Sequence, residues 1–187
     1  MEKLTRQRRK RNKTHNSIMH SAKALFEQRG IGNVTIDEIS ENADVSRSTF
    51  FTHFQSIDAL LLELANQEIE DLLEVVKKEN KTGLANIELL FCKLLDDIYN
   101  YPSLSMFLLT NNILSNKNQS CKPIVDIIKN DLQESNVNKK DFSIDETCGL
   151  LLGTVFGPLY QKFIEGTPFN DIKEQKRTIH KILTLLK

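Results

Sequence analysis

Hydroxyl and guanidinium groups cluster in one short stretch of the sequence, residues 46–53, which reads Ser-Arg-Ser-Thr-Phe-Phe-Thr-His. At about 100° per residue, Phe50 and Phe54 define the buried side of a helix there. The side chains that point away from that side are polar: Ser48, Thr49 and Thr52. A helix with such an outer face suits the major groove of DNA. The same spacing also fits an ordinary helical hairpin in a core, and spacing alone leaves both interpretations open.

A second short helix must hold this one in position. Thr35 followed three residues later by Glu38 is a capping box, which predicts a helix that starts at Thr35 and has one apolar face. Asp44 tolerates the left-handed conformation that a tight turn needs, and Ser46 can cap the helix that follows. Residues 35–54 therefore predict a helix, a turn and a second helix.

This segment resembles the DNA-binding segment of the TetR family of bacterial transcription regulators. Members of that family typically have a Thr-led helix, an Ala-Gly-Val-Ser turn and an aromatic-rich recognition helix that ends in His-Phe or Tyr-Phe. Here the turn is Ala-Asp-Val-Ser and the second helix ends in His53-Phe54. The resemblance extends from Ile18 to Leu61, about the first third of the chain.

Three positions depart from the family pattern. Asp44 stands where the family usually has Gly. Asp tolerates a left-handed conformation better than most other residues do. Ile57 stands where the family usually has a Lys that binds a phosphate, and Phe51 replaces the usual Tyr. Both of these changes delete a contact to the DNA backbone, so we expect nonspecific affinity to depend more on the N-terminus.

The resemblance implies a homodimer that holds two recognition helices about one turn of DNA apart, roughly 34 to 36 Å or a multiple. It implies that five side chains face the groove: Ser46, Arg47, Ser48, Thr49 and Thr52. Arg47 is the best candidate for reading a guanine edge through its forked donors. Three more would set the helix against the DNA backbone: Thr35, Phe51 and His53.

Charge is distributed unevenly along a chain whose net charge is zero. Residues 1–13 hold seven Lys or Arg against one acid, which predicts a flexible basic arm that settles along phosphates, although an ordinary solvated terminus remains the alternative. Residues 1–55 hold ten basic and six acidic side chains, and residues 56–187 hold fifteen and nineteen. A bracing helix is expected from about Thr14 to Gln28, so we assign 14–55 to a three-helix DNA-binding domain.

Residues 56–187 predict a helical ligand-binding and dimerisation domain, so that the whole chain is all-α. The expected helices cover about 56–78, 84–100, 103–114, 121–135, 143–166 and 169–186. The last two are interpreted as the dimer interface, where the resemblance also places it. Gly149, Gly153 and Gly157 recur on one face of the first of these two helices, so a neighbouring backbone can approach closely. That face could instead pack within one subunit.

The apolar surplus of residues 84–164 suggests an effector cavity. Its candidate lining residues are Phe91, Leu95, Tyr99, Met106, Phe107, Thr110, Phe156 and Tyr160. For any one of them, filling a core is the alternative role. Polar anchors are sparse, so we expect an apolar or amphipathic effector that releases the homodimer from a palindromic operator and makes the protein a ligand-responsive repressor.

Other classes of function are less well supported. The four histidines have no Cys, Ser or acid at a spacing that indicates a nucleophile or metal site, so we expect no enzyme, no cofactor and no metal. Three widely separated cysteines argue against a disulfide framework and suit a reducing cytoplasm. No apolar run approaches a membrane span. The remaining alternative is a DNA-binding architectural or protein-controlled regulator without a small-molecule ligand.

Overall fold

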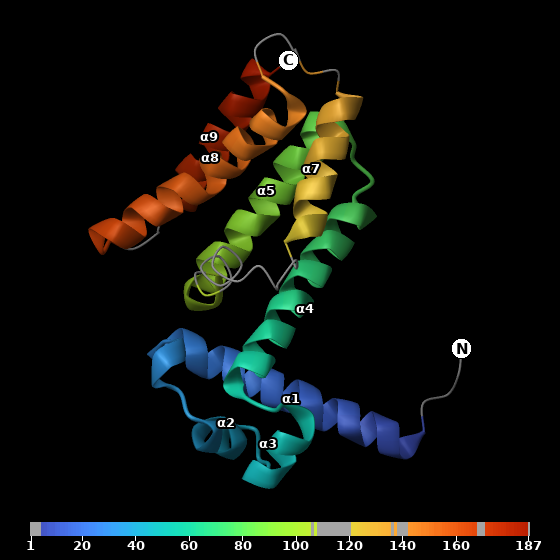
Figure 1. Cartoon of the computed structure of the whole chain (residues 1–187), viewed down its shortest axis with the longest axis vertical. Helices are drawn as coiled ribbons and strands as arrows, with labels where there is room; N and C mark the ends of the chain where they lie inside the picture. The colour runs from blue at the N-terminus through green and yellow to red at the C-terminus, as the bar shows by residue number, and fades with distance from the viewer. Residues whose placement is uncertain are drawn as a thin grey trace. The chain divides into compact units, whose positions relative to one another are not determined.

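The computed structural model describes residues 5–105, 107, 121–135, 137, 142–167 and 171–186 (Figure 1). Within these residues every regular element is a helix, which confirms the predicted all-α fold. The contacts divide the described chain into two compact units. The first contains the residues up to 68 together with those from 101 to 107, and the second contains 69–100 and the residues from 121 onward. None of the described helices combines the length and the apolar character needed to cross a bilayer.

The N-terminal unit is built from short elements around one long helix, α1 (Arg6–Arg29). A 3₁₀ turn, η1 (Ile31–Asn33), leads to α2 (Ile36–Asn42) and α3 (Arg47–His53), and α4 (Ile57–Lys78) begins in this unit. Figure 1 shows α1, α2 and α3 grouped in the blue part of the chain. The three predicted N-terminal helices are therefore confirmed.

Aromatic and branched side chains from all of these helices meet in one apolar core. Phe26 of α1 and Phe50 of α3 are fully buried in it. Leu104, which comes from the second stretch of chain in this unit, is also buried there, and Phe107 packs against the same core. Burying each such side chain contributes about 1.5–3 kcal/mol, so this second stretch is a structural part of the unit.

Side chains of α1 also hold the backbone of that second stretch. The Glu27 carboxylate accepts hydrogen bonds from the backbone amides of Ser103 (3.2 Å) and Leu104 (3.0 Å). These amides belong to the first turn of a helical segment, where a negative charge is favoured. The Nζ atom of Lys23 lies 3.3 Å from the centroid of the Tyr101 ring, which fixes the residue where the segment starts.

The structure differs from the prediction at the start of α1. The helix begins at Arg6 rather than near Thr14, so residues 6–13 of the expected flexible arm are helical. Thr5 caps it, because its hydroxyl accepts a hydrogen bond from the Arg8 amide at 3.4 Å. Arg, Lys and Gln lose little side-chain freedom in a helix, and this propensity outweighs the mutual repulsion on which the prediction was based.

The second unit consists mainly of four helices: α5 (Gly83–Asn100), α7 (Lys122–Glu134), α8 (Ile144–Glu165) and α9 (Ile172–Leu185). Helix α5 packs against α7 and α9, and α8 packs against the same two helices (Figure 1). The predicted boundaries agree with these to within a few residues. Of the helix predicted at 103–114, residues 103–105 and 107 are helical, and the others lie outside the described residues.

Helix α5 is capped by side chains of α7 rather than by its own sequence. The buried Asp131 carboxylate accepts hydrogen bonds from the Gly83 amide (2.9 Å) and from Nδ2 of Asn86 (2.8 Å). The Ser135 hydroxyl accepts a third from the Leu84 amide (3.0 Å). Gly83 has φ +61°, and a Cβ there would lie 2.5 Å from Ser135 Oγ, so only glycine fits this junction.

Candidate nucleic-acid interface

The turn between α2 and α3 has the predicted geometry. Asp44 has φ 53°, and the Val45 amide donates a hydrogen bond to the Ser40 carbonyl at 2.9 Å. The reciprocal Thr35–Glu38 capping box starts α2, and its hydrogen bonds to Thr35 hold the pKa of the Glu38 carboxyl below its usual range. Asp in place of the usual Gly is therefore compatible with a closed helix-turn-helix.

Helix α3 has the expected division between an apolar inner face and a polar outer face. Phe50 and Phe54 are buried in the core of the N-terminal unit, with exposed fractions of 0% and 3%. Arg47, Ser48 and Thr52 are exposed and Thr49 is half-buried. Because the aromatic side chains anchor α3 from inside, its outer face is held in a fixed orientation.

The hydroxyl groups of this outer face are linked to one another. Ser46 Oγ caps the helix by accepting a hydrogen bond from the Thr49 amide at 3.1 Å. The same atom lies 2.8 Å from both Ser48 Oγ and Thr49 Oγ1, and Thr52 Oγ1 donates to the Ser48 carbonyl at 3.0 Å. A hydroxyl has one donor and two acceptor positions, so these groups keep capacity for a further partner.

Arg47 has two partners that place its guanidinium at the start of α3. Its Nη1 atom lies 2.5 Å from Oδ1 of Asp37, in the first turn of α2. Its Cζ atom lies 5.5 Å from the centroid of the Phe51 ring, which is 45% exposed. Asp37 was not among the residues predicted for this surface. An acid in the first turn of a helix is expected from the helix dipole alone. Nothing in the local sequence therefore connected Asp37 with Arg47.

The end of α3 lies beside a small cluster of titratable groups. The His53 and His15 rings have centroids 5.5 Å apart, and His15 stacks on Phe54 at 4.6 Å and hydrogen-bonds Glu63 Oε1 at 2.7 Å. Burial lowers the pKa of His53, and the positive charges of His15 and Arg11 lower that pKa further, against the opposing charge of Glu63. A neutral His53 offers DNA one donor and one acceptor rather than a charge.

The basic residues at the start of α1 are all solvent-exposed. They are Arg6, Arg8, Arg9, Lys10, Arg11 and Lys13. No acid occupies the first turn of this helix, so their charges are not neutralised locally and add to the positive end of the helix dipole. This segment therefore provides a concentrated positive surface on the same unit as α3.

The residues predicted to line the effector cavity lie in different environments. Phe91 and Leu95 are fully buried on α5, whereas Tyr99 and Tyr160 are exposed and Phe156 is half-buried.

Phe107 packs against the core of the N-terminal unit, and Met106 and Thr110 lie outside the described residues. The described members of the predicted set are therefore divided between two cores and the surface.

Comparison with known proteins identifies the fold of the N-terminal unit. Residues 18–64 match the family model described as "Bacterial regulatory proteins, tetR family". The matched segment of the chain belongs to this family. The matched residues begin within α1 and end within α4, so they contain the turn, the aromatic anchors and the outer face of α3.

A curated relative and two solved structures extend this comparison. The TetC protein of transposon Tn10 from Escherichia coli is 32% identical over 100 residues, which cover 52% of this chain and about half (51%) of that protein. The fatty acid degradation regulator FadR from Bacillus halodurans superimposes with a TM-score of 0.72 at 12% identity, over 91% of this chain and 94% of that one. FadR from Bacillus subtilis in complex with stearoyl-CoA has a TM-score of 0.67 at 17% identity, over 90% and 96%.

At these identities the two solved structures show the fold of the chain and nothing of its ligand. The family match of residues 18–64 is to regulatory proteins, which agrees with the expectation that the chain is not an enzyme. Burial raises the pKa of the thiols of Cys92, Cys121 and Cys148, which makes them poor nucleophiles at neutral pH. Among the described residues no group of three or more potential ligands could hold a metal ion.

Proposed function

We propose that this TetR-family chain is a cytoplasmic, DNA-binding transcription regulator that acts as a repressor. The observation that carries the proposal is the outer face of α3, where Arg47 and a row of hydroxyl groups are exposed while Phe50 and Phe54 fix the helix from inside. Such a helix can enter a major groove with its N-terminal residues at the base edges. The exposed basic start of α1 supplies phosphate contacts on the same unit.

We assign residues 14–55 to DNA contact, 1–13 to phosphate contact, and those of residues 56–187 that lie outside the N-terminal unit to effector binding and dimerisation. Thr35 and Phe51 are exposed and His53 is half-buried, which is compatible with contacts to the DNA backbone. Phe51 has no hydroxyl, so it offers only apolar contact. The alternative, a DNA-binding architectural or protein-controlled regulator, needs the same N-terminal unit and differs only in the absence of an effector.

The partner that we propose for α8 and α9 is a second copy of the chain. On α8 a Cβ at Gly149, Gly153 or Gly157 would meet no atom within 4 Å, so this face is open in the single chain. Exposed apolar side chains lie beside it, with Leu150 56% and Ile164 71% exposed.

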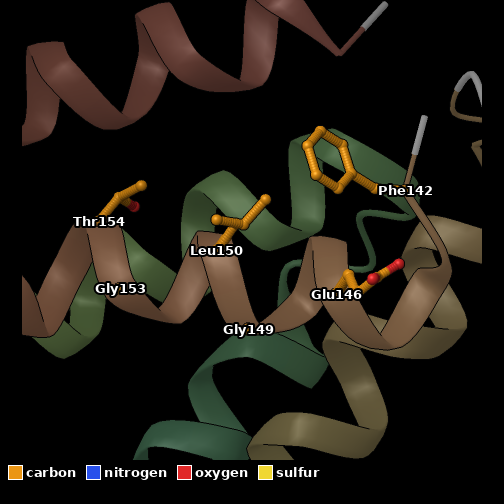
Figure 2. A pocket seen from close by; sticks show the side chains of 6 residues that line it. All are labelled: Phe142, Glu146, Gly149, Leu150, Gly153 and Thr154. Carbon is orange, nitrogen blue, oxygen red and sulfur yellow. The ribbon is translucent and has the colours of Figure 1, made fainter.

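An open depression accompanies this face of α8. Figure 2 shows Leu150 and Thr154 projecting from one side of the helix, with Phe142 of the preceding segment on that side as well. Its lining is mainly apolar, and Glu146 stands at the N-terminal end of the helix. An apolar face with small residues at its centre is suited to close packing against an identical face. Two copies joined in this way would present two α3 helices to two half-sites.

For the effector we propose a molecule with a long apolar chain and a polar head. The support is twofold: a structural neighbour was solved with stearoyl-CoA, and α5 carries a buried apolar side of suitable composition. Saturated acyl-CoA thioesters are therefore the first compounds to test. Binding would favour a dimer whose half-spacing no longer fits the operator.

The experiment that tests the proposed function is a footprint on the DNA upstream of the chain's own gene. A protected palindrome that is lost on addition of stearoyl-CoA or another acyl-CoA supports a ligand-responsive repressor. A footprint that no such compound alters favours the architectural or protein-controlled alternative. Absence of any protected sequence, with the chain folded and dimeric, would contradict the proposal.

Arg47→Ala should reduce discrimination between the operator and random duplex by about tenfold, because a bidentate contact to guanine contributes about 1–3 kcal/mol of selectivity. The measurement is the ratio of the two dissociation constants by fluorescence anisotropy. Arg29→Ala is the matched control, since Arg29 is also exposed and paired with an acid, Glu38, but lies outside α3. Equal ratios for Arg47→Ala and the wild type would refute the role of Arg47.

Replacing Arg8, Arg9 and Arg11 together by Gln should flatten the salt dependence of DNA affinity. The helix is retained because Gln is also a good helix former, and each lost phosphate contact lowers the slope of log K against log salt by about 0.9. Lys77→Gln/Lys78→Gln removes exposed charges at the end of α4 and serves as the control. A slope that matches the wild type would mean that these residues do not contact phosphates.

A further inference from the structure

Three side chains from two helices form a cluster on the exposed surface of the helix-turn-helix. Asp37 lies in the first turn of α2, and Arg47 and Phe51 lie one turn apart on α3. The Arg47 guanidinium contacts the Asp37 carboxylate at 2.5 Å and lies 5.5 Å from the Phe51 ring centroid. The Asp37 and Arg47 side chains are 69% and 55% exposed, so this contact is made on a surface open to a ligand.

We propose that Asp37 is a specificity-determining residue of the DNA interface, which acts by positioning the Arg47 guanidinium and by opposing its use on a phosphate. The inference rests on the proposed function, because it concerns how the same surface chooses among DNA sequences. No base or phosphate contact is assigned to Asp37 itself.

Asp37 can position the Arg47 guanidinium without using all of its donors. A guanidinium has five N–H donors in a planar fork, and a guanine edge takes two of them. The contact to Asp37 uses Nη1, which leaves donors on the rest of the fork for a base. An unrestrained arginine has many rotamers, and a side chain already held between a carboxylate and a ring has less rotamer entropy to lose on binding.

The negative charge of Asp37 opposes the use of Arg47 on a phosphate. An exposed ion pair contributes little net stability, so DNA can compete with Asp37 for Arg47. On a random sequence Arg47 would turn to a phosphate, and the Asp37 carboxylate would then be left unpaired beside a polyanion. On an operator whose guanine fits the held guanidinium, the pair stays intact and its net charge is zero. Asp37 thus weakens binding to the wrong sequences more than to the right one, which is how specificity is gained.

The test is a double-mutant cycle with Asp37→Asn, Arg47→Ala and the two combined. Dissociation constants for the protected operator and for a random duplex of equal length are measured at two salt concentrations. Glu41→Gln is the matched control, since Glu41 is an exposed acid on the same helix that forms no ion pair with Arg47. Asp37→Ser, which also replaces the carboxylate by a small uncharged polar group, guards against an effect particular to asparagine.

Asp37→Asn is expected to tighten binding to random duplex by about two- to fivefold and to reduce the selectivity ratio by about fivefold, with a steeper salt dependence on random DNA. In the Arg47→Ala background the same change should leave the selectivity ratio unaltered.

An equal gain of affinity for both duplexes, in both backgrounds and in Glu41→Gln, would overturn the inference and reduce Asp37 to a repulsive charge. The proposed function would survive that result, since the wild type would still select its operator. A wild type that prefers no duplex would overturn the proposed function and this inference with it.

Discussion

Replacing Leu150 by aspartate is expected to raise the dissociation constant of the proposed dimer by at least about two orders of magnitude. Leu150 is 56% exposed on the open face of α8, so the monomer should fold unchanged. In the dimer, the loss of a buried leucine costs about 1.5–3 kcal/mol and the unpaired carboxylate adds a penalty of similar size. Each 1.4 kcal/mol is a factor of ten in the constant.

Sedimentation equilibrium measures this change directly. Val75→Asp is the matched control, because Val75 is an exposed apolar side chain of α4 and does not belong to α8 or α9. Operator affinity should fall together with dimerisation, since the second half-site is then no longer bound at high effective concentration. A Leu150→Asp protein that stays dimeric would refute the assignment of α8 to the interface.

Gly153→Ala provides a second test with a different signature. Within one chain the new methyl group meets no atom within 4 Å, and alanine favours a helix over glycine by about 1 kcal/mol. The monomer should therefore become no less stable. Any weakening of the dimer by this variant must arise from a second chain that packs closely against the glycine.

Asp131→Ala is expected to lower the stability of the second unit by about 3 kcal/mol. The Asp131 carboxylate is 6% exposed and accepts hydrogen bonds from the Gly83 amide and from Asn86 Nδ2. Its removal leaves a buried backbone N–H without a partner, which costs about 1–3 kcal/mol, and removes a charge that favours the start of α5. At about 2–4 °C per kcal/mol, the melting temperature should fall by roughly 6–12 °C.

The same substitution at Asp126, an exposed acid of the same helix, is the control and should change the melting temperature little. Thermal unfolding followed by circular dichroism gives the shift, and hydrogen exchange at the amides of Gly83 and Leu84 reports the start of α5 itself. Equal melting temperatures for the two variants would mean that the capping contacts contribute nothing measurable.

Local rules predicted the elements of this chain well, because the decisive residues lie within a few positions of one another. Both capping boxes, Thr35 with Glu38 and Ser143 with Glu146, are present, and Asp44 has the expected left-handed conformation. The same rules failed at Arg6, where charge repulsion was weighed above a cap and good helix propensity.

Contacts between residues distant in sequence could not be predicted. Glu27 binds amides 76 and 77 positions away, and neither an acid in α1 nor a helix start after Pro102 indicates the other. Asp37 and Arg47 are ten positions apart, but their pairing depends on the angle that the turn sets between two helices. The effector-lining residues were predicted from composition. Composition does not show that Phe107 packs against the N-terminal core whereas Phe91 is buried on α5.

The docking of residues 101–105 and 107 among the N-terminal helices has a practical consequence. The N-terminal unit is assembled from two separate segments of the chain, so no single cleavage of the polypeptide releases it intact. A fragment that stops at residue 68 would lack Leu104 and Phe107 and leave the Glu27 carboxylate without its amides. A chimaera that joins this unit to a foreign sensor domain must therefore contain both segments.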